Sequence, residues 1–342
     1  MNEIKISKKL KINKNSKPLI VAEVSANHCG SKKKFLKHII AAKKNGADLV
    51  KIQTYEADDM LVNKRFMIKK GLWKNRNLWK LYQQAKTPYE WHHDAFKVAK
   101  KKNIELFSTP FSVKSLNFLK KFKPNVFKIA SFELSDLNLI SEVAKLNKPI
   151  ILSTGLANIS EINNAVKIIK KQHNKIILMY CVSSYPAKLE EIDFNKIEYI
   201  RKMTGIKNIG FSDHTKGISA ATASISNGVR IVEKHFKLNG RNNSPDESFS
   251  INENELKKLR TEFDNLHKIY SKTQSLEKKN SLFFRRSIYA IKKINKGDIF
   301  SKKNIGCFRP FVGLCASNYF KLIGKKSKKN ISLYSVLKKN CF

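Results

Sequence analysis

Short apolar runs recur eight times along the chain, and polar residues able to take part in chemistry follow most of them. Runs of four to seven apolar residues are typical of strands that are buried on both faces of a sheet. Stretches with helical spacing of apolar positions lie between them, as at 35–45, 89–102 and 160–171, with Ser160 as the expected N-cap of the third. The strand runs are 18–22, 49–52, 104–107, 126–130, 149–152, 176–182, 206–211 and 229–232. Alternating strands and helices predict a parallel sheet, and eight such units predict an α/β fold of the (β/α)8 TIM-barrel type over residues 17–270.

The regions outside these units are predicted to form smaller structures. Residues 1–16 are expected to be an N-terminal extension or hairpin that covers the bottom of the barrel, and the polar segment 271–283 to be a linker. Residues 284–342 predict a small β-rich domain with strands at 286–291, 297–300 and 331–336. A domain of about 60 residues has a marginal core, so we expect it to lean on another surface.

The segment 58–87 is too long for an ordinary connection between a strand and a helix. It follows the second strand run at the end of the barrel where the chemistry is expected. Long ordered loops at this face tend to be functional, so we expect this insertion to contribute to the site.

Composition narrows the classes of function. The net charge of +41 suggests polyanion binding, but the lysines are spread along the whole chain and no nucleic-acid-binding motif accompanies them. We interpret the charge as solvated surface with a weak general attraction for polyanions. No apolar stretch approaches the roughly 20 residues that span a bilayer, and Glu23 interrupts the first apolar run. We therefore expect a cytoplasmic chain without a membrane or specific nucleic-acid partner. The five cysteines contain no CxxC pair, which argues against a disulfide framework or a four-cysteine zinc site.

Two histidines follow the last two strand runs and are therefore expected to be neighbours at the barrel mouth. His214 and His235 are suited to a divalent-metal site, with two structural histidines as the alternative. The nearby carboxylates of Asp213, Glu233 and Asp246 favour the metal site, because carboxylates orient metal-bound imidazoles. Four other histidines in helical and loop stretches are expected at the surface: His92, His93, His173 and His267.

Two lysines lie inside apolar runs. Burying Lys51 and Lys128 is costly unless they face a wet cavity that holds an anion; the alternative is that both reach out to solvent. Glu23 ends the first run and is a candidate general acid or base, or else an acid that stabilises its loop. Neither a nucleotide P-loop nor a dinucleotide fingerprint is present. Hydroxyls that follow other runs favour phosphate or carboxylate binding: Ser131, Ser153, Ser183 and Ser212.

These residues resemble one known family, the sialic acid synthases. The C-terminal region resembles the antifreeze-like (SAF, β-clip) domain of that family. The resemblance covers nearly the whole chain, and it implies condensation of phosphoenolpyruvate with a hexosamine-derived sugar to a nine-carbon 2-keto acid. The motifs SANH, SSYP and LWxxxxLWxLY favour the pseudaminic acid branch of the family. The motifs are AEVSANH (22–28), KIQTY (51–55), STPF (108–111), KIASFE (128–133), CVSSYP (181–186), FSDHT (211–215), EKHF (233–236), PDESFS (245–250) and RRSIYAIKKINKGDIFSKKNI (285–305).

The resemblance also implies a role for each candidate residue. Glu23 would handle the proton of the water, and His214 and His235 would bind Mn2+ or Mg2+ and complete the catalytic set. Asp213 and Glu233 would support these ligands. The phosphoenolpyruvate site would comprise Lys51, Lys128, Ser131, Ser153, Ser183 and Ser212. The sugar site would comprise Gln53, Tyr185, Asp246 and Arg309.

The family further implies a domain-swapped homodimer, in which Arg309 of one chain reaches the barrel mouth of the other. Phe311 stands where the family usually has glycine in this loop. Two alternatives stay open: a synthase of N-acetylneuraminate or legionaminic acid with the same chemistry, and a polyanion-binding protein on a degenerate barrel.

Overall fold

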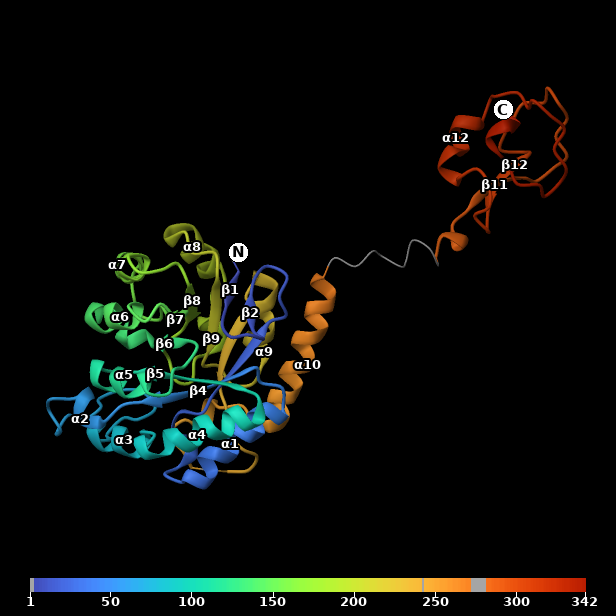
Figure 1. Cartoon of the computed structure of the whole chain (residues 1–342). Coiled ribbons are helices and arrows are strands. Elements are labelled where there is room, and N and C mark those ends of the chain that lie inside the picture. The colour runs from blue at the N-terminus through green and yellow to red at the C-terminus, as the bar shows by residue number, and fades with distance from the viewer. Residues whose placement is uncertain (1–2, 242, 272–280) are drawn as a thin grey trace. The chain divides into compact units, whose positions relative to one another are not determined.

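The computed structural model describes residues 3–241, 243–271 and 281–342, and these belong to two compact units, 1–271 and 272–342. In the first unit, eight parallel strands close into a barrel in the order β10-β3-β4-β5-β6-β7-β8-β9 (Figure 1). The predicted (β/α)8 barrel is therefore confirmed. The strands are β3 Leu19–Glu23, β4 Leu49–Thr54, β5 Glu105–Pro110, β6 Phe127–Ile129, β7 Ile150–Ser153, β8 Ile176–Cys181, β9 Ile209–Asp213 and β10 Ile231–His235.

Helices surround the barrel because each connection must return the chain to the start of the next parallel strand. Their apolar faces are buried in one large core with the outward-facing side chains of the strands. The helices are α1 Lys32–Lys44, α2 Ala57–Met60, α3 Leu78–Ala85, α4 Tyr89–Lys102, α5 Val113–Lys120, α6 Leu137–Ala144, α7 Ile159–Lys170, α8 Asn195–Thr204, α9 Ser219–Ser224 and α10 Glu253–Tyr270.

One helix start differs from the sequence prediction. The N-cap of α7 is Asn158, so Ser160 lies inside the helix. The Asn158 side chain accepts a hydrogen bond from the backbone N–H of Glu161, whose carboxylate accepts one from the backbone N–H of Asn158. This reciprocal capping box satisfies two N–H groups of the helix terminus, which a serine two residues later cannot do.

The inside of the barrel is apolar at its N-terminal end. Leu19, Leu49 and Phe107 belong to a buried cluster that also contains Ile4 and Ile12 of the N-terminal hairpin. That hairpin pairs β1 (Ile4–Lys5) with β2 (Lys11–Ile12) in antiparallel register. Apolar side chains therefore fill the N-terminal end, and inward positions toward the C-terminal ends of the strands are left for polar groups.

The insertion after β4 is largely ordered. Besides α2 and α3 it contains a hairpin-like turn over 66–78, with an antiparallel bridge between Met67 and Asn77 and a hydrogen bond from Ile68 N–H to the Arg76 carbonyl at 3.0 Å. The insertion thus presents a defined surface rather than an irregular loop.

The second unit has its own small core, formed by residues such as Ile288, Phe300 and Leu337. Its antiparallel pair is β11 (Ser287–Ala290) and β12 (Ile305–Phe308), and its helix α12 spans Tyr319–Leu322. The strand predicted over 286–291 is present in shortened form.

The prediction of strands over 297–300 and 331–336 was wrong. Both segments make only isolated bridges, as between Ile299 and Lys326. Gly297 and Tyr334 have φ angles of +93° and +61°, which interrupt extended backbone. Most of the predicted linker, 272–280, lies outside the described residues. Among those that are described, no helix is long and apolar enough to cross a membrane.

Candidate functional site

Four buried charges from four strands meet at the C-terminal end of the barrel. The Lys128 ammonium lies 2.8 Å from one oxygen of Glu233, and the Lys51 ammonium lies 3.4 Å from the other. Lys51 also lies 2.6 Å from Glu23 Oε2. None of the four side chains is more than 5% exposed, so the lysines do not reach out to solvent as the alternative interpretation required. Buried ammonium groups of this kind are suited to bind an anionic substrate.

The pKa values of the two carboxyl groups of this cluster, Glu23 and Glu233, are shifted in opposite directions. Burial raises the pKa of Glu23 to about 7, despite the nearby ammonium of Lys51. Burial acts the same way on Glu233, but the charges of Lys128 and Lys51 outweigh it and lower that pKa to about 2. Glu23 Oε1 has no hydrogen-bond partner among the described residues. One carboxyl can therefore exchange a proton near neutral pH while the other stays an anion, a division typical of acid–base sites.

Hydroxyl groups line a tight cradle beside the mouth. The hydroxyl oxygens of Ser131 and Ser183 lie 3.0 Å apart. A Cβ atom at Gly155 would lie 2.3 Å from the Ser183 hydroxyl and 2.5 Å from Ser131 Cβ, so only glycine fits here. The other two predicted serines, Ser153 and Ser212, are buried at the ends of β7 and β9. All four hydroxyls thus stand at strand ends, where they can donate to an anion.

The two histidines predicted as metal ligands are neighbours, with ring centroids 5.7 Å apart. His214 Nδ1 donates to the Val182 carbonyl at 2.8 Å, so Nε2 carries the lone pair. His235 Nδ1 is buried without a hydrogen bond, 3.8 Å from Asp246 Oδ2. Burial lowers the pKa of His214 to about 4 and that of His235 well below its usual range, so both rings are neutral at physiological pH.

Neutral imidazoles with available nitrogen lone pairs fit a divalent cation. Over the described ranges, however, no group of three or more histidine, cysteine or carboxylate side chains is arranged to hold a metal. The chain would therefore supply two imidazole ligands, and water or substrate oxygens would complete the coordination shell.

Asp213 pairs with a lysine that was not among the predicted site residues. Its carboxylate forms a fully buried ion pair with Lys234, at 2.9 Å, and accepts a hydrogen bond from the Thr215 N–H at 2.8 Å. Lys234 also donates to the Thr215 carbonyl. The pair therefore fixes the backbone on either side of His214. Sequence reasoning missed Lys234, because it follows Glu233 beyond the apolar run 229–232, whereas Lys51 lies within its run.

The structure places the predicted sugar-site residues in different units. Tyr185 lies over His214, with ring centroids 4.3 Å apart, and Asp246 is buried and accepts a hydrogen bond from the Ala26 N–H. Gln53 is half-buried at the end of β4. Arg309 is exposed and belongs to the second unit.

One further group was omitted from the prediction, and two histidines were predicted at the wrong depth. Burial raises the pKa of Glu133 to about 7, and its Oε2 is buried without a hydrogen bond. Glu133 stands inside the motif KIASFE, next to Lys128 and Ser131, and was not singled out. His92 and His173 are buried rather than surface residues; His92 Nε2 lies 2.7 Å from the Thr54 hydroxyl.

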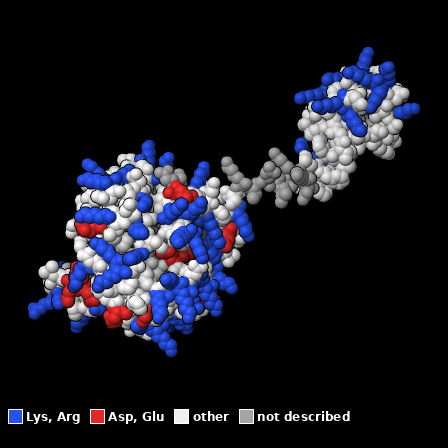
Figure 2. All heavy atoms as spheres, in the orientation of Figure 1, with Lys and Arg blue, Asp and Glu red and all other residues white. Residues whose placement is uncertain are grey.

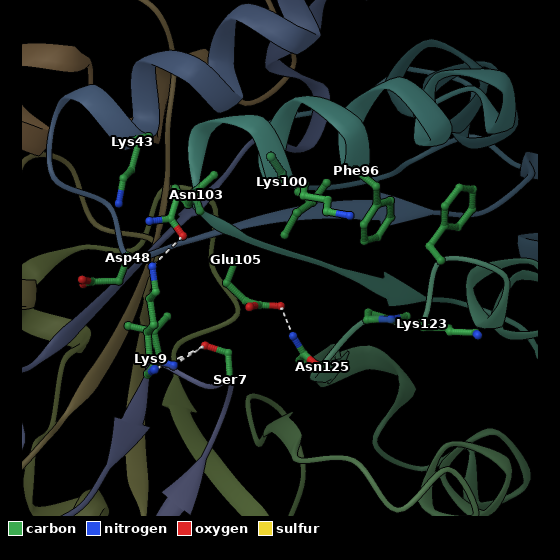
Figure 3. Close-up of a pocket in the computed structure, with 16 residues that line it drawn as sticks. Ser7, Lys9, Lys43, Asp48, Phe96, Lys100, Asn103, Glu105, Lys123 and Asn125 are labelled. Atoms are coloured by element: carbon green, nitrogen blue, oxygen red, sulfur yellow. Dashed lines mark hydrogen bonds between the residues drawn. The ribbon is translucent and has the colours of Figure 1, made fainter.

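A separate cavity of about 460 Å³ lies where the N-terminal hairpin, the C-terminal end of α4 and the start of β5 meet (Figure 3). Its carboxylates are already engaged: Glu105 accepts from Asn125 at 3.0 Å, and Asp48 pairs with Arg260 at 3.1 Å. Barrel enzymes work at the opposite end of the strands. The mouth is therefore the candidate active site.

Known proteins with similar sequences cover nearly the whole chain. The sequence model of the NeuB family matches residues 38–275, and that of the SAF domain matches residues 285–340. The chain is 41% identical over 341 residues to pseudaminic acid synthase from Campylobacter jejuni, covering 96% of this chain and 98% of that protein. It is 38% identical to pseudaminic acid synthase from Helicobacter pylori, covering 91% and 94%.

More distant relatives also match most of the chain. N,N'-diacetyllegionaminic acid synthase from Campylobacter jejuni is 34% identical, covering 92% of this chain and 97% of that protein. The crystal structure of an N-acetylneuraminic acid synthetase from Leptospira borgpetersenii, in complex with citrate, superposes with a TM-score of 0.74 at 31% identity. It covers 81% of this chain and 94% of that one.

Proposed function

The chain belongs to the NeuB family, and on that premise we propose that it condenses phosphoenolpyruvate with 2,4-diacetamido-2,4,6-trideoxy-β-L-altropyranose (the altrose sugar) and water. The products are pseudaminic acid and phosphate. Two pseudaminic acid synthases at 41% and 38% identity support this sugar over that of the legionaminic acid synthase at 34%. The observation that carries the proposal is the buried pair of lysines on Glu233, next to two neutral imidazoles at one barrel mouth.

Phosphoenolpyruvate binds at the lysine cluster. Its phosphate and carboxylate receive charge-assisted hydrogen bonds from Lys51 and Lys128. Serine hydroxyls complete the anion site: Ser131, Ser153, Ser183 and Ser212. Glu233 keeps both lysines charged and in place, since its carboxylate contacts both ammonium groups.

The two imidazoles would hold Mn2+ or Mg2+. Such an ion would polarise the aldehyde oxygen of the open-chain sugar. Their neutral state supports this role, because a protonated imidazole has no lone pair for a metal. The buried carboxylate of Asp246 lies next to His235 and faces the same region, where a sugar hydroxyl can donate to it.

The chain's own groups then direct the chemistry. C3 of phosphoenolpyruvate attacks the aldehyde carbon, whose oxygen takes up a proton to become a hydroxyl. Water adds at C2, and the tetrahedral intermediate loses phosphate by cleavage of the bond between C2 and the phosphate oxygen. Glu23 accepts the proton of that water, because its pKa of about 7 lets it act as a base near neutral pH. Gln53 and Tyr185 contact the sugar.

The second unit completes the site from another chain. We propose a domain-swapped homodimer in the cytoplasm, in which Arg309 of one chain binds the sugar in the barrel of the other. The exposed position of Arg309 and the match of residues 285–340 to the SAF domain support this arrangement.

A phosphate-release assay on the purified chain tests the reaction. With phosphoenolpyruvate and a divalent metal, we expect the altrose sugar to be turned over faster than its 6-deoxy-mannose analogue and N-acetylmannosamine. Faster turnover of either analogue would reassign the sugar. If none of the three sugars leads to phosphate release, the enzyme assignment is contradicted and the polyanion-binding alternative is favoured.

A further inference from the structure

The insertion after β4 reaches across the barrel mouth. Trp73 stands near the tip of its 66–78 turn and lies against Tyr185, with ring centroids 5.8 Å apart. Tyr185 follows β8, which is four strands from β4 in a ring of eight. The Trp73 indole N–H also donates to the Pro245 carbonyl at 3.2 Å, in the segment between β10 and α10. One residue of the insertion thus bridges opposite sides of the mouth.

The bridge stands directly over the reacting end of the site. Tyr185 lies between Trp73 and the candidate metal ligands, with its ring 4.3 Å from that of His214 and 6.4 Å from that of His235. Phe249, which is buried, contacts both Tyr185 and His235 at 5.4 and 4.8 Å. A continuous aromatic wall therefore runs from the two imidazoles to the outer edge of the mouth.

This wall offers the sugar an apolar surface. The single N–H of the Trp73 indole is already donated to Pro245, and an indole has no acceptor. The altrose sugar presents a C6 methyl and a second acetamido methyl where N-acetylmannosamine has hydroxyl groups. Methyl groups gain from contact with an aromatic face, whereas a hydroxyl placed there loses its hydrogen bonds to water.

We propose that Trp73 is a specificity-determining residue, which covers the bound sugar and selects for methyl groups over hydroxyls at C4 and C6. The inference rests on the proposed function and adds the part of the insertion that sets the substrate class. Phosphoenolpyruvate is held deeper in the barrel by Lys51 and Lys128, so Trp73 acts on the sugar alone.

The test compares full-length Trp73→Ala and Trp73→Phe with the wild type, using phosphate release with the altrose sugar and with N-acetylmannosamine. For Trp73→Ala we expect KM for the altrose sugar to rise and its kcat/KM to fall by about 10–100-fold, the range for an apolar contact. The ratio of kcat/KM for the altrose sugar to kcat/KM for N-acetylmannosamine should fall in this variant, while KM for phosphoenolpyruvate stays unchanged. Trp73→Phe keeps an aromatic face and should retain most of the preference.

Trp79 offers a matched control on the same insertion. It is half-buried like Trp73 and its indole also donates a hydrogen bond, at 2.8 Å to Asp58, but it stands on α3 away from Tyr185. Trp79→Ala should leave sugar KM and preference unchanged.

The inference is overturned if Trp73→Ala keeps the wild-type KM and preference for the sugar, or if Trp73→Phe loses as much preference as Trp73→Ala. An equal loss in Trp79→Ala would also overturn it, because the insertion would then act only through its fold. Failure of the proposed function shows differently, as a wild-type chain that releases no phosphate with the altrose sugar.

Discussion

At the scale of single residues, the site depends on two carboxyl groups, Glu23 and Glu233, whose pKa values differ widely. Glu23 has a pKa of about 7 because it is buried, and it must be ionised to accept a proton from water. As the pH falls through 7, Glu23 takes up a proton and the base is lost. We therefore expect kcat/KM to fall on the acid side of a pKa near 7, and Glu23→Gln to remove both this acid limb and most of the activity. A rate that is flat from pH 6 to 8 in the wild type would contradict the role as base.

Lys128 tests the anion site at the same scale. A charge-assisted hydrogen bond contributes about 1.5–3 kcal/mol, so Lys128→Ala should weaken phosphoenolpyruvate binding by at least about tenfold. Lys33→Ala, on the exposed face of α1, is the control and should bind normally. Isothermal titration of both variants measures the difference. Equal weakening in the two would mean that diffuse positive charge, rather than a built site, attracts the anion.

His214 and His235 test the metal proposal. His214→Ala and His235→Ala should each abolish turnover and weaken Mn2+ binding, measured directly by the paramagnetic signal of the free ion. Each chain should keep the thermal stability of the wild type, since both rings stand at strand ends rather than in the apolar core. Full activity of either variant in chelated buffer would exclude the metal role.

The sequence indicates which residues are unusual, but not which side chains they contact in the folded chain. Lys51 and Lys128 were recognisable because charges within apolar runs are costly. Glu233 was recognisable as a carboxylate near a candidate metal ligand. Their common contact was not recognisable, because it depends on closure of the barrel, which brings β4, β6 and β10 around one cavity. The same holds for Glu133, whose raised pKa is a consequence of burial that a polar motif does not reveal.

At the scale of elements, the buried ion pair of Lys234 and Asp213 joins the ends of β10 and β9. The two residues are register partners on adjacent strands. Removing one partner of a buried pair leaves the other charge uncompensated, at a cost of about 3–5 kcal/mol. Lys234→Met should lower the free energy of unfolding by this amount, measured in urea.

The double variant Lys234→Met with Asp213→Leu separates pairing from packing. It removes both charges, so we expect it to recover most of the stability that Lys234→Met loses. If the double variant is as stable as the wild type but binds Mn2+ more weakly, the ion pair also orients His214. A Lys234→Met chain as stable as the wild type would contradict the pair's role in joining the two strand ends.

The elements themselves were predictable to different degrees. All eight barrel strands were found, because parallel strands buried on both faces read as continuous apolar runs. The strands of the second unit were predicted less well. Its segments pair through single bridges and are interrupted by residues with positive φ angles, and no apolar run indicates either feature. The cap of α7 was misplaced because Asn158 and Ser160 are both good caps, and only the reciprocal bond with Glu161 decides between them.

At the scale of the whole molecule, positive charge covers both units. Lysine and arginine are spread over the first unit and gather toward the upper end of the second, and acidic residues are few on the visible face (Figure 2). Such a surface raises the local concentration of anions such as phosphoenolpyruvate and makes association sensitive to salt. We expect kcat/KM for phosphoenolpyruvate to fall with ionic strength while kcat changes little. A rise in kcat/KM with salt would contradict this.

The proposed dimer makes the last prediction. If Arg309 acts in another chain's barrel, neither Arg309→Ala nor His214→Ala chains are active alone, but a mixed dimer has one complete site. In that dimer the barrel of the Arg309→Ala chain keeps His214 and receives the intact Arg309 of its partner. Random exchange after mild denaturation and refolding should restore about one quarter of the wild-type sites, because half of the dimers are mixed. Wild-type chains treated in the same way control for refolding.

The two mechanisms of failure are distinguishable. If the exchanged mixture stays inactive while wild-type chains recover, Arg309 acts within its own chain. If Arg309→Ala chains are active alone, Arg309 has no essential role, since an arginine that acts in either barrel would be needed for turnover. The residue at 311 bears on this outcome, because the Phe311 ring stacks under the Arg285 guanidinium at 5.3 Å and so shapes the loop that carries Arg309. Phe311→Gly should therefore change KM for the sugar in the same direction as Arg309→Ala, and to a smaller extent, if this loop delivers the arginine to the site.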